Sequence, residues 1–303
     1  MCDRRVLVLT GATGSGKTAL AIELARQFDA EIVGADSRQI YRGMPIGTAA
    51  PSPEQLSTVP HHLIGFLDPQ ERYSAARYAE DALQAIRSIH ARGRHAIVAG
   101  GTGFYIRALL GGVAPAPQYD EALRARLARE ALVHPPQFLA EWLRVRDRRR
   151  AGQVHPRDTY RVLRALEIAM AAPAQTLRDD AIPNLRSEGL AWELIFLDVG
   201  WPILDRRIAR RVETMLRTGL LEEAERVGEG AVAASAVGYP QALAYLGGWS
   251  TEAELRATLE RATRRYARRQ RAWFRGEPAT QWIAPDRVAD VVREKLRWSS
   301  KRE

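Results

Sequence analysis

The sequence of 303 residues contains a single cysteine, Cys2. This excludes a disulfide framework and a cysteine-based zinc site, and it fits a reducing cytoplasm. Long apolar runs are also missing, since none approaches the roughly 18–20 residues that a membrane-spanning helix needs. The short apolar run that follows the basic N-terminus leads into a glycine-rich loop rather than a cleavage site, so we expect no signal peptide. These absences predict a cytoplasmic protein without a membrane partner.

Lysine is scarce as well, because only Lys17, Lys295 and Lys301 are present and the other 42 of 45 basic residues are arginine. With 36 acidic residues the net charge is +9. The excess is concentrated in segment 113–178, with 12 arginines against 7 acids, and in segment 256–275, with 8 arginines against one glutamate. Basic patches of this kind predict a polyanionic partner, with RNA or DNA ahead of a membrane surface.

Strand and helix patterns alternate over the first 112 residues and return later in the chain. The expected strands are 5–10, 31–36, 95–99 and 192–199, and the expected helices of the first part are 18–28, 75–92 and 104–110. Loops containing proline and glycine are expected over 43–69. Such alternation predicts an α/β fold, a parallel sheet with helices on both faces, and binding residues where strands end, as at Asp36 and Thr102.

The alternation stops at residue 113. From there to residue 185 the sequence shows only helical patterns rich in arginine and leucine. We therefore predict three segments: 1–112 is the first part of an α/β core, 113–185 is an all-helical insertion domain, and 186–303 is the remainder of the core. Helices are expected over 200–275, and the last of them are basic.

Residues 11–18 read GATGSGKT, a complete GxxxxGK[ST] phosphate loop with the required strand before it and helix after it. The glycines let backbone N–H groups converge on phosphate oxygens, and the helix N-terminus adds positive potential. The lysine meets the phosphate charge, and the threonine hydroxyl is a typical Mg²⁺ ligand. The motif, often an ATP-binding one, predicts phosphate binding without identifying the ligand. The predicted binding residues are Gly11, Ala12, Thr13, Gly14, Ser15, Gly16, Lys17 and Thr18.

Two aspartates that end expected strands are candidates for chemistry. Asp36 could orient or deprotonate an acceptor, or it could simply cap a turn. A P-loop NTPase also needs a strand-end aspartate for magnesium, and Asp198 could fill that role, so sequence order leaves the two open. Further along, Arg207 and Arg211 lie four apart on one helical face and could clamp a diphosphate, with a solvated charged face as the alternative.

Two helical segments carry arginines suited to RNA. Asp158 is expected to cap a helix on which Arg161 and Arg164 are available for phosphates. In the C-terminal basic segment, Tyr266 and Trp273 share an apolar face. Four arginines share another face: Arg264, Arg268, Arg271 and Arg275. The pattern predicts a helix whose arginines lie against an RNA backbone while its aromatic side packs.

Together these motifs resemble the tRNA dimethylallyltransferase (tRNA isopentenyltransferase) family, bacterial type, over nearly the whole chain. The matching segments are GATGSGKTALA at 11–21, ADSRQIYRGMPIGTA at 35–49, PHHLIGFLDPQERYSAARY at 60–78, GGTGFYIRALLGG at 100–112, HPRDTYRVLRALEI at 155–168, LDRRIARRVETMLRTGLLEE at 204–223, AVGYPQALAYL at 236–246 and ATRRYARRQRAWFR at 262–275. The resemblance implies a P-loop kinase-like core that binds dimethylallyl diphosphate. It also implies transfer of the prenyl group to N6 of the adenosine beside the anticodon in tRNA, position 37, with release of diphosphate.

The resemblance further implies residue roles. Asp36 would be the general base, Lys17 and Arg211 would stabilise the leaving diphosphate, and Thr18 would bind Mg²⁺, the implied cofactor. The helical insertion would grip the anticodon stem-loop, and nothing requires more than a monomer. The implied tRNA-contacting residues are Asp36, Ser37, Arg38, Gln39, Thr102, Arg124, Tyr160, Arg161, Val162, Leu163 and Arg164.

The chain departs from the family pattern at four positions. Ala50 stands where lysine is usual and Gly65 where aspartate is usual, Ser235 lies near a usual arginine, and Pro240 replaces a basic or polar residue. The last two losses leave the tRNA contacts around 237–239 open. None of the four lies in the phosphate loop, so activity is expected to survive with altered tRNA affinity.

Three other functions are alternatives. A small-molecule P-loop kinase would turn over ATP and has no use for the arginine-rich insertion. A prenyltransferase acting on free adenine nucleotides should lack that insertion. A catalytically idle RNA-binding protein would keep the fold, but the intact Lys17, Thr18, Asp36 and Arg211 disfavour it.

Overall fold

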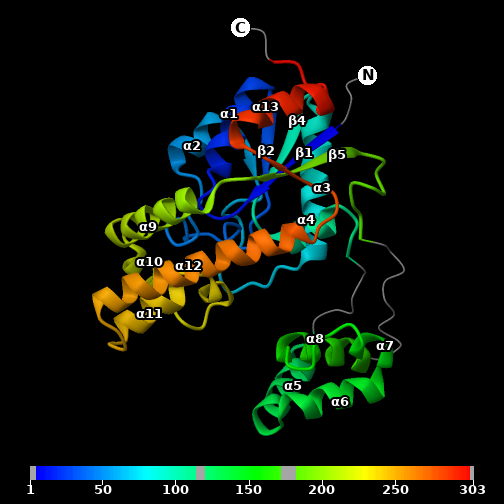
Figure 1. The fold of residues 1–303 in the computed structure, drawn as a ribbon, viewed down its shortest axis with the longest axis vertical. Helices are drawn as coiled ribbons and strands as arrows, with labels where there is room; N and C mark the ends of the chain where they lie inside the picture. Colours follow the sequence, from blue (N-terminus) through cyan, green and yellow to red (C-terminus); the bar gives the residue numbers. More distant parts are fainter. Residues whose placement is uncertain (1–4, 114–119, 172–181, 301–303) are drawn as a thin grey trace. The chain divides into compact units, whose positions relative to one another are not determined.

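The computed structural model describes residues 5–113, 120–171 and 182–300. The chain divides into two compact units, one formed by 1–113 with 183–303 and the other by 114–182 (Figure 1). We call the first the core unit and the second the helical unit.

The core unit is built on a six-stranded sheet in which every pairing is parallel, in the order β3-β2-β4-β1-β5-β6. The strands are β1 (Arg5–Gly11), β2 (Ala30–Gly34), β3 (His61–His62), β4 (His95–Ala99), β5 (Ala191–Leu197) and β6 (Thr280–Ile283). Strand β1 pairs with β4 on one side and β5 on the other, and nearly all of it is buried. Its carboxyl end, where the phosphate loop begins, therefore lies in the middle of the sheet edge.

Helices cover both faces of the sheet, which confirms the predicted α/β fold. On one face Leu7 and Ile97 pack with Leu24 of α1 and with the C-terminal segment around α13. On the other face Phe196 of β5 contacts Phe274 of α12, with ring centroids 5.4 Å apart. The helices of this unit are α1 (Lys17–Gln27), α2 (Pro53–Thr58), α3 (Ala75–Ala91), α4 (Gly103–Leu109), α9 (Trp201–Arg217), α10 (Leu220–Val227), α11 (Tyr239–Leu246), α12 (Glu252–Arg275) and α13 (Val288–Val291), with short helical turns at Val232–Ser235, Pro285–Arg287 and Val292–Leu296.

Helices α9 to α12 pack around a second apolar cluster, and Figure 1 shows α9 and α12 side by side in the core unit. This cluster encloses a carboxylate, since Glu223 is only 1% exposed. Glu223 accepts hydrogen bonds from the backbone N–H of Ile46 (2.9 Å) and Gly47 (2.6 Å) and from the hydroxyl of Tyr239 (2.8 Å). The bundle thereby holds the loop that follows the ADSRQIY segment.

In the helical unit, every element within residues 120–171 is a helix: α5 (Glu121–Val133), α6 (Pro136–Arg146), α7 (Arg148–Ala151) and α8 (Thr159–Met170). Their apolar faces form a separate small core of Leu127, Leu139, Leu143, Val162, Ala165 and Leu166. Among the described residues of the whole chain, no helix is long and apolar enough to cross a membrane.

Three expectations about local structure are wrong. The second strand ends at Gly34 rather than Asp36, because the Asp36 carboxylate accepts the N–H of Arg38 (2.9 Å) and turns the chain. Segment 43–69 is not only loop, since it contains α2 and β3. Strand β6 was not expected, because its four residues are only partly buried and give no apolar run.

Candidate active site

The phosphate loop connects β1 to α1. Gly14 and Gly16 have φ of 83° and 94°, in the left-handed region that glycine adopts without a Cβ clash. Helix α1 begins at Lys17, and the first N–H groups of a helix have no partner within it. The Ser15 hydroxyl is buried and has no hydrogen-bond partner among the described residues. The loop therefore offers unsatisfied donors of the kind that phosphate oxygens accept.

Cationic side chains from two helices converge on this loop. The Lys17 Nζ donates to the Ala12 carbonyl (3.3 Å). From α9, Arg211 donates to the Thr13 hydroxyl oxygen (2.7 Å), and Arg207 donates to the carbonyl oxygens of the two following residues (3.3 and 3.1 Å). The i, i+4 spacing of the two arginines thus places both on the loop.

The pKa values of Lys17 and Arg211 both depend on the charge of Asp36. Burial lowers the pKa of Lys17 from 10.5 to about 8; the Asp36 carboxylate opposes this shift, and the charge of Arg211 adds to it. Burial also lowers the pKa of Arg211, again opposed by Asp36. Two cations with one nearby carboxylate form a partly buried site with a positive surplus, which suits an anionic ligand.

The choice between the two strand-end aspartates follows from their surroundings. Asp36 interacts with both loop-binding cations. Asp198 instead pairs with Arg271 on α12 (3.2 Å). Asp36 is therefore the carboxylate associated with the phosphate loop.

The residues after Asp36 are linked to the turn that follows β4. The backbone N–H of Ser37 donates to the Thr102 hydroxyl oxygen (2.9 Å), and that hydroxyl donates to the Ser37 side chain (3.3 Å). Gln39 donates to the carbonyls of Thr48 (3.2 Å) and Ala49 (3.0 Å), so it holds the following loop. Asp36, Ser37 and Thr102 thus form one group at the carboxyl edge of the sheet.

Helix α12 contributes residues that the sequence reasoning did not assign to the site. Burial and the Asp36 charge raise the pKa of Tyr266, and a hydrogen bond with Thr102 acts in the opposite direction. Gln270 bonds both the phosphate loop and the turn after β4. Trp273 lies against Gly103, where a Cβ would be 2.2 Å from the indole nitrogen. The 266/270/273 spacing puts the three on one helical face and could have identified Gln270.

The arginine stripe of α12, expected to lie against RNA, contacts side chains of the core unit at all four positions. Arg264 pairs with Asp205 (2.5 Å) and Glu260 (3.0 Å), and Arg271 pairs with Asp198. The other two stack on tryptophans, Arg268 over Trp201 at 5.0 Å and Arg275 over Trp282 at 5.8 Å. Within the described parts of the chain, the exposed Arg261 and Arg265 form no ion pair, and they make up a different stripe.

In the helical unit, Asp158 caps α8 as predicted, accepting the N–H of Arg161 (3.1 Å). The Arg161 guanidinium pairs with the same carboxylate (2.7 Å) and remains exposed. Tyr160 is 73% exposed, whereas Val162 is 1% exposed and Leu163 packs against the unit's core. The side chains of Val162 and Leu163 therefore pack in the core of the helical unit. The exposed residues of this segment are Tyr160 and Arg161.

The remaining two arginines expected to contact tRNA share one buried carboxylate. Glu167 pairs with Arg164 at 2.6 Å and with Arg124 at 3.6 Å. This pairing brings together on one unit two basic residues from α5 and α8.

The four departures from the family pattern are accommodated locally. Gly65 has a φ of 59° with open space around it. Pro240 lies in the first turn of α11, where the missing N–H has no helical partner to lose. Ser235 is exposed and donates to the Val232 carbonyl, and Ala50 closes a turn with Pro45. None of these four contacts the phosphate loop.

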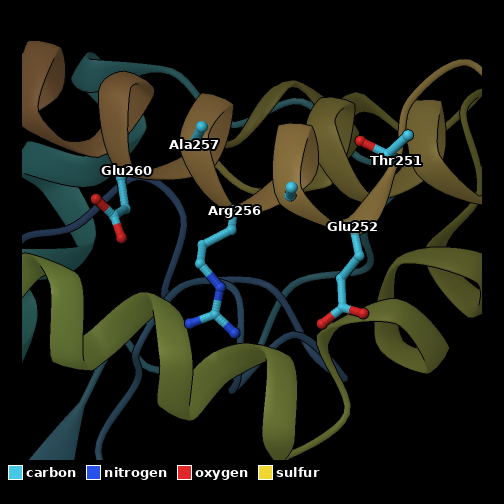
Figure 2. Close-up of a pocket in the computed structure, with 6 residues that line it drawn as sticks. Thr251, Glu252, Arg256, Ala257 and Glu260 are labelled. Atoms are coloured by element: carbon cyan, nitrogen blue, oxygen red, sulfur yellow. The ribbon is translucent and has the colours of Figure 1, made fainter.

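An open hollow runs along the N-terminal half of α12. It is lined by Thr251, Glu252, Ala253, Arg256, Ala257 and Glu260, and Figure 2 shows Glu252, Arg256 and Glu260 extending from the same side of the helix. The hollow includes no residue of the phosphate loop or the Asp36 group, so it is separate from the candidate site.

The residues present fit a magnesium ion held mainly by phosphate. Within the described residues no group of three histidine, cysteine or carboxylate side chains could hold a metal. Mg²⁺ commonly uses one or two protein oxygens and completes its shell with phosphate oxygens and water. The Thr18 hydroxyl, on the first turn of α1, and the unbonded Ser15 hydroxyl supply oxygens of that type.

Comparisons with known proteins match nearly the whole chain. The family model described as IPP transferase matches residues 39–277. The tRNA dimethylallyltransferase of Anaeromyxobacter sp. (strain Fw109-5) is 44% identical over 298 residues, covering 96% of this chain and 98% of that protein. The tRNA dimethylallyltransferase 2 of Syntrophus aciditrophicus (strain SB) is 40% identical, covering 95% and 94%. The crystal structure of the full-length tRNA isopentenylpyrophosphate transferase from Bacillus halodurans is similar with a TM-score of 0.69 and 33% identity, over 97% of this chain and 96% of that one.

Proposed function

Because the chain belongs to the IPP transferase family, to which tRNA dimethylallyltransferases belong, we propose that it transfers a dimethylallyl group from dimethylallyl diphosphate to tRNA. The acceptor is N6 of the adenosine beside the anticodon, position 37, and diphosphate is released. One observation carries this proposal: the phosphate loop, the Arg211 guanidinium and the Asp36 carboxylate form a single electrostatic group.

The donor diphosphate binds at the phosphate loop. Its oxygens accept from the N–H groups at the start of α1, and Lys17 and Arg211 neutralise the charge that grows as the C1–O bond breaks. Arg207 braces the loop through its carbonyl contacts. Mg²⁺ held by the Thr18 hydroxyl and the phosphate oxygens would supply further charge neutralisation.

The acceptor amine needs help because its lone pair is delocalised into the adenine ring. N6 forms a bond to C1 of the prenyl group, the C1–O bond electrons leave with diphosphate, and the N6 proton goes to Asp36. One oxygen of that carboxylate, Oδ1, accepts the Arg38 N–H, which orients the group and leaves Oδ2 to accept the proton.

Each unit separately offers exposed residues suited to tRNA. In the helical unit the exposed Tyr160 and Arg161 offer a stacking ring and a guanidinium, and in the core unit Arg261 and Arg265 offer cations to the backbone. The target base must leave its stack to reach Asp36, as in other base-modifying enzymes.

The test is incubation of purified protein with dimethylallyl diphosphate, Mg²⁺ and unmodified tRNA, followed by nucleoside mass spectrometry. We expect isopentenyladenosine at position 37, and no prenylated product from free AMP. Asp36→Asn should slow transfer by roughly 100-fold or more with tRNA binding retained. Asp198→Asn is the matched control, a strand-end aspartate engaged with Arg271, and should transfer at the parent rate. ATP turnover, or prenylation of AMP in preference to tRNA, would contradict the proposal.

A further inference from the structure

Gln270 on α12 is a buried glutamine, 5% exposed, in a helix otherwise rich in arginine. Both ends of its amide are bonded to distant backbone. Oε1 accepts the N–H of Thr13 in the phosphate loop (2.8 Å), and Nε2 donates to the carbonyl of Gly101 in the turn after β4 (3.0 Å). One side chain thus joins two loops that follow different strands of the sheet.

The chemistry of this bridge is specific to a neutral amide. Its two partners are of opposite kind, a donor and an acceptor, so a carboxylate could satisfy Thr13 but could not donate to Gly101. The fit is close, because a Cβ at Gly101 would lie 2.1 Å from the Gln270 nitrogen. A methionine would fill a similar volume and make neither bond.

Each end of the bridge leads to a group used in the reaction. The hydroxyl of Thr13 accepts from Arg211, which faces the diphosphate. The residue after Gly101 is Thr102, whose hydroxyl accepts the N–H of Ser37 beside Asp36. The bonds therefore form a continuous path from the donor side of the site to the acceptor side.

We propose that Gln270 is a positioning residue for prenyl transfer: it fixes the spacing between the phosphate loop and the Asp36 group. The inference rests on the proposed function. Because the Thr13 N–H is taken up by Gln270, that N–H is not offered to the donor phosphate. Loss of the bridge should accordingly reduce the rate of the chemical step and leave the binding of both substrates nearly unchanged.

The experiment compares wild type, Gln270→Met, Gln270→Glu and a control in single-turnover prenylation of tRNA, with the donor KM and the tRNA Kd measured separately. The control is Thr263→Val, a buried polar residue of the same helix whose hydroxyl, among the described residues, donates only to the Leu259 carbonyl within α12 (2.8 Å). We expect Gln270→Met to lower the transfer rate by roughly 100-fold, the cost of about 1 Å of misplacement. Gln270→Glu should also be slow, since it lacks the donor for Gly101. Both substrate affinities should stay within about threefold of wild type, and the control should be unaffected.

The inference is overturned if either folded variant transfers at the wild-type rate. It is also overturned if the loss is matched by an equal rise in the donor KM or the tRNA Kd, because Gln270 would then be a binding residue. Failure of both variants to fold would assign Gln270 to folding and refute the inference as well. A wild-type protein that yields no isopentenyladenosine would instead count against the proposed function.

Discussion

Replacement of Arg211 by glutamine tests the electrostatic group at the phosphate loop most directly. Arg211 supplies a charge-assisted hydrogen bond to Thr13, and in the proposed reaction it is one of the cations that face the leaving diphosphate. Removing one preorganised donor from a developing negative charge costs about 10²–10³ in kcat, or about 3–4 kcal/mol. The same change has a second effect, because the Arg211 charge is one of the causes that lower the pKa of Lys17. Without it, the pKa of Lys17 should rise above its value of about 8.

The assay is the pH profile of donor kcat/KM, which reports ionisations of the free enzyme. Arg211→Gln should show a lower kcat together with an alkaline limb displaced to higher pH. Arg210→Gln is the matched control, because this neighbour on α9 is exposed and, within the described residues, makes no hydrogen bond or ion pair with the loop. An unshifted limb, or one displaced to lower pH, would refute the electrostatic reasoning, and an unchanged kcat would remove Arg211 from the chemistry.

Three further perturbations have defined outcomes. In wild type, donor kcat/KM should fall as the pH rises through about 8, because Lys17 of the free enzyme loses its proton at that pH. A kcat/KM that stays constant well above pH 8 would contradict this assignment of the ionisation to Lys17. Thr18→Ala should raise the Mg²⁺ concentration for half-maximal rate by about tenfold or more in a magnesium titration, whereas an unchanged requirement would remove this hydroxyl from the metal site. Glu223→Leu leaves two backbone N–H groups and the Tyr239 hydroxyl without their partner. Denaturant unfolding should therefore show a free energy of unfolding lower by about 3 kcal/mol or more, whereas Tyr239→Phe, which removes one of these bonds, should lower it by about 1 kcal/mol. Equal losses in the last pair would mean that the N–H bonds contribute little.

The phosphate loop could be predicted from the sequence because its geometry is local. Glycine at positions 14 and 16 permits the left-handed turns, and the strand before and the helix after are encoded by neighbouring residues. The i, i+4 spacing of Arg207 and Arg211 carried information for the same reason, since a helix fixes which side chains share a face.

What could not be predicted depends on partners distant in the chain. The arginines at 264 and 271 share a face that looks suited to RNA, but the carboxylates of Asp205 and Asp198 lie against it in the fold. The spacing of residues 266, 270 and 273 places Gln270 on a shared helical face, but its hydrogen bonds could not be predicted, because both partners lie in loops far from it in the sequence. Edge strands such as β6 escape detection because half-buried residues give no apolar run.

The position of β1 between β4 and β5 has a consequence for the order in which the protein is made. As the chain leaves the ribosome, β1 can pair with β4 early, but its other edge waits for β5, which follows the entire helical unit. An apolar strand with an open edge is a template for aggregation, and pairings between distant segments form slowly. The open edge of β1 is therefore exposed while residues 114–182 are being synthesised. The hydrogen bonds from α9 and α12 to the phosphate loop can form only after those helices have been synthesised. Chaperone dependence should be concentrated in that interval of translation.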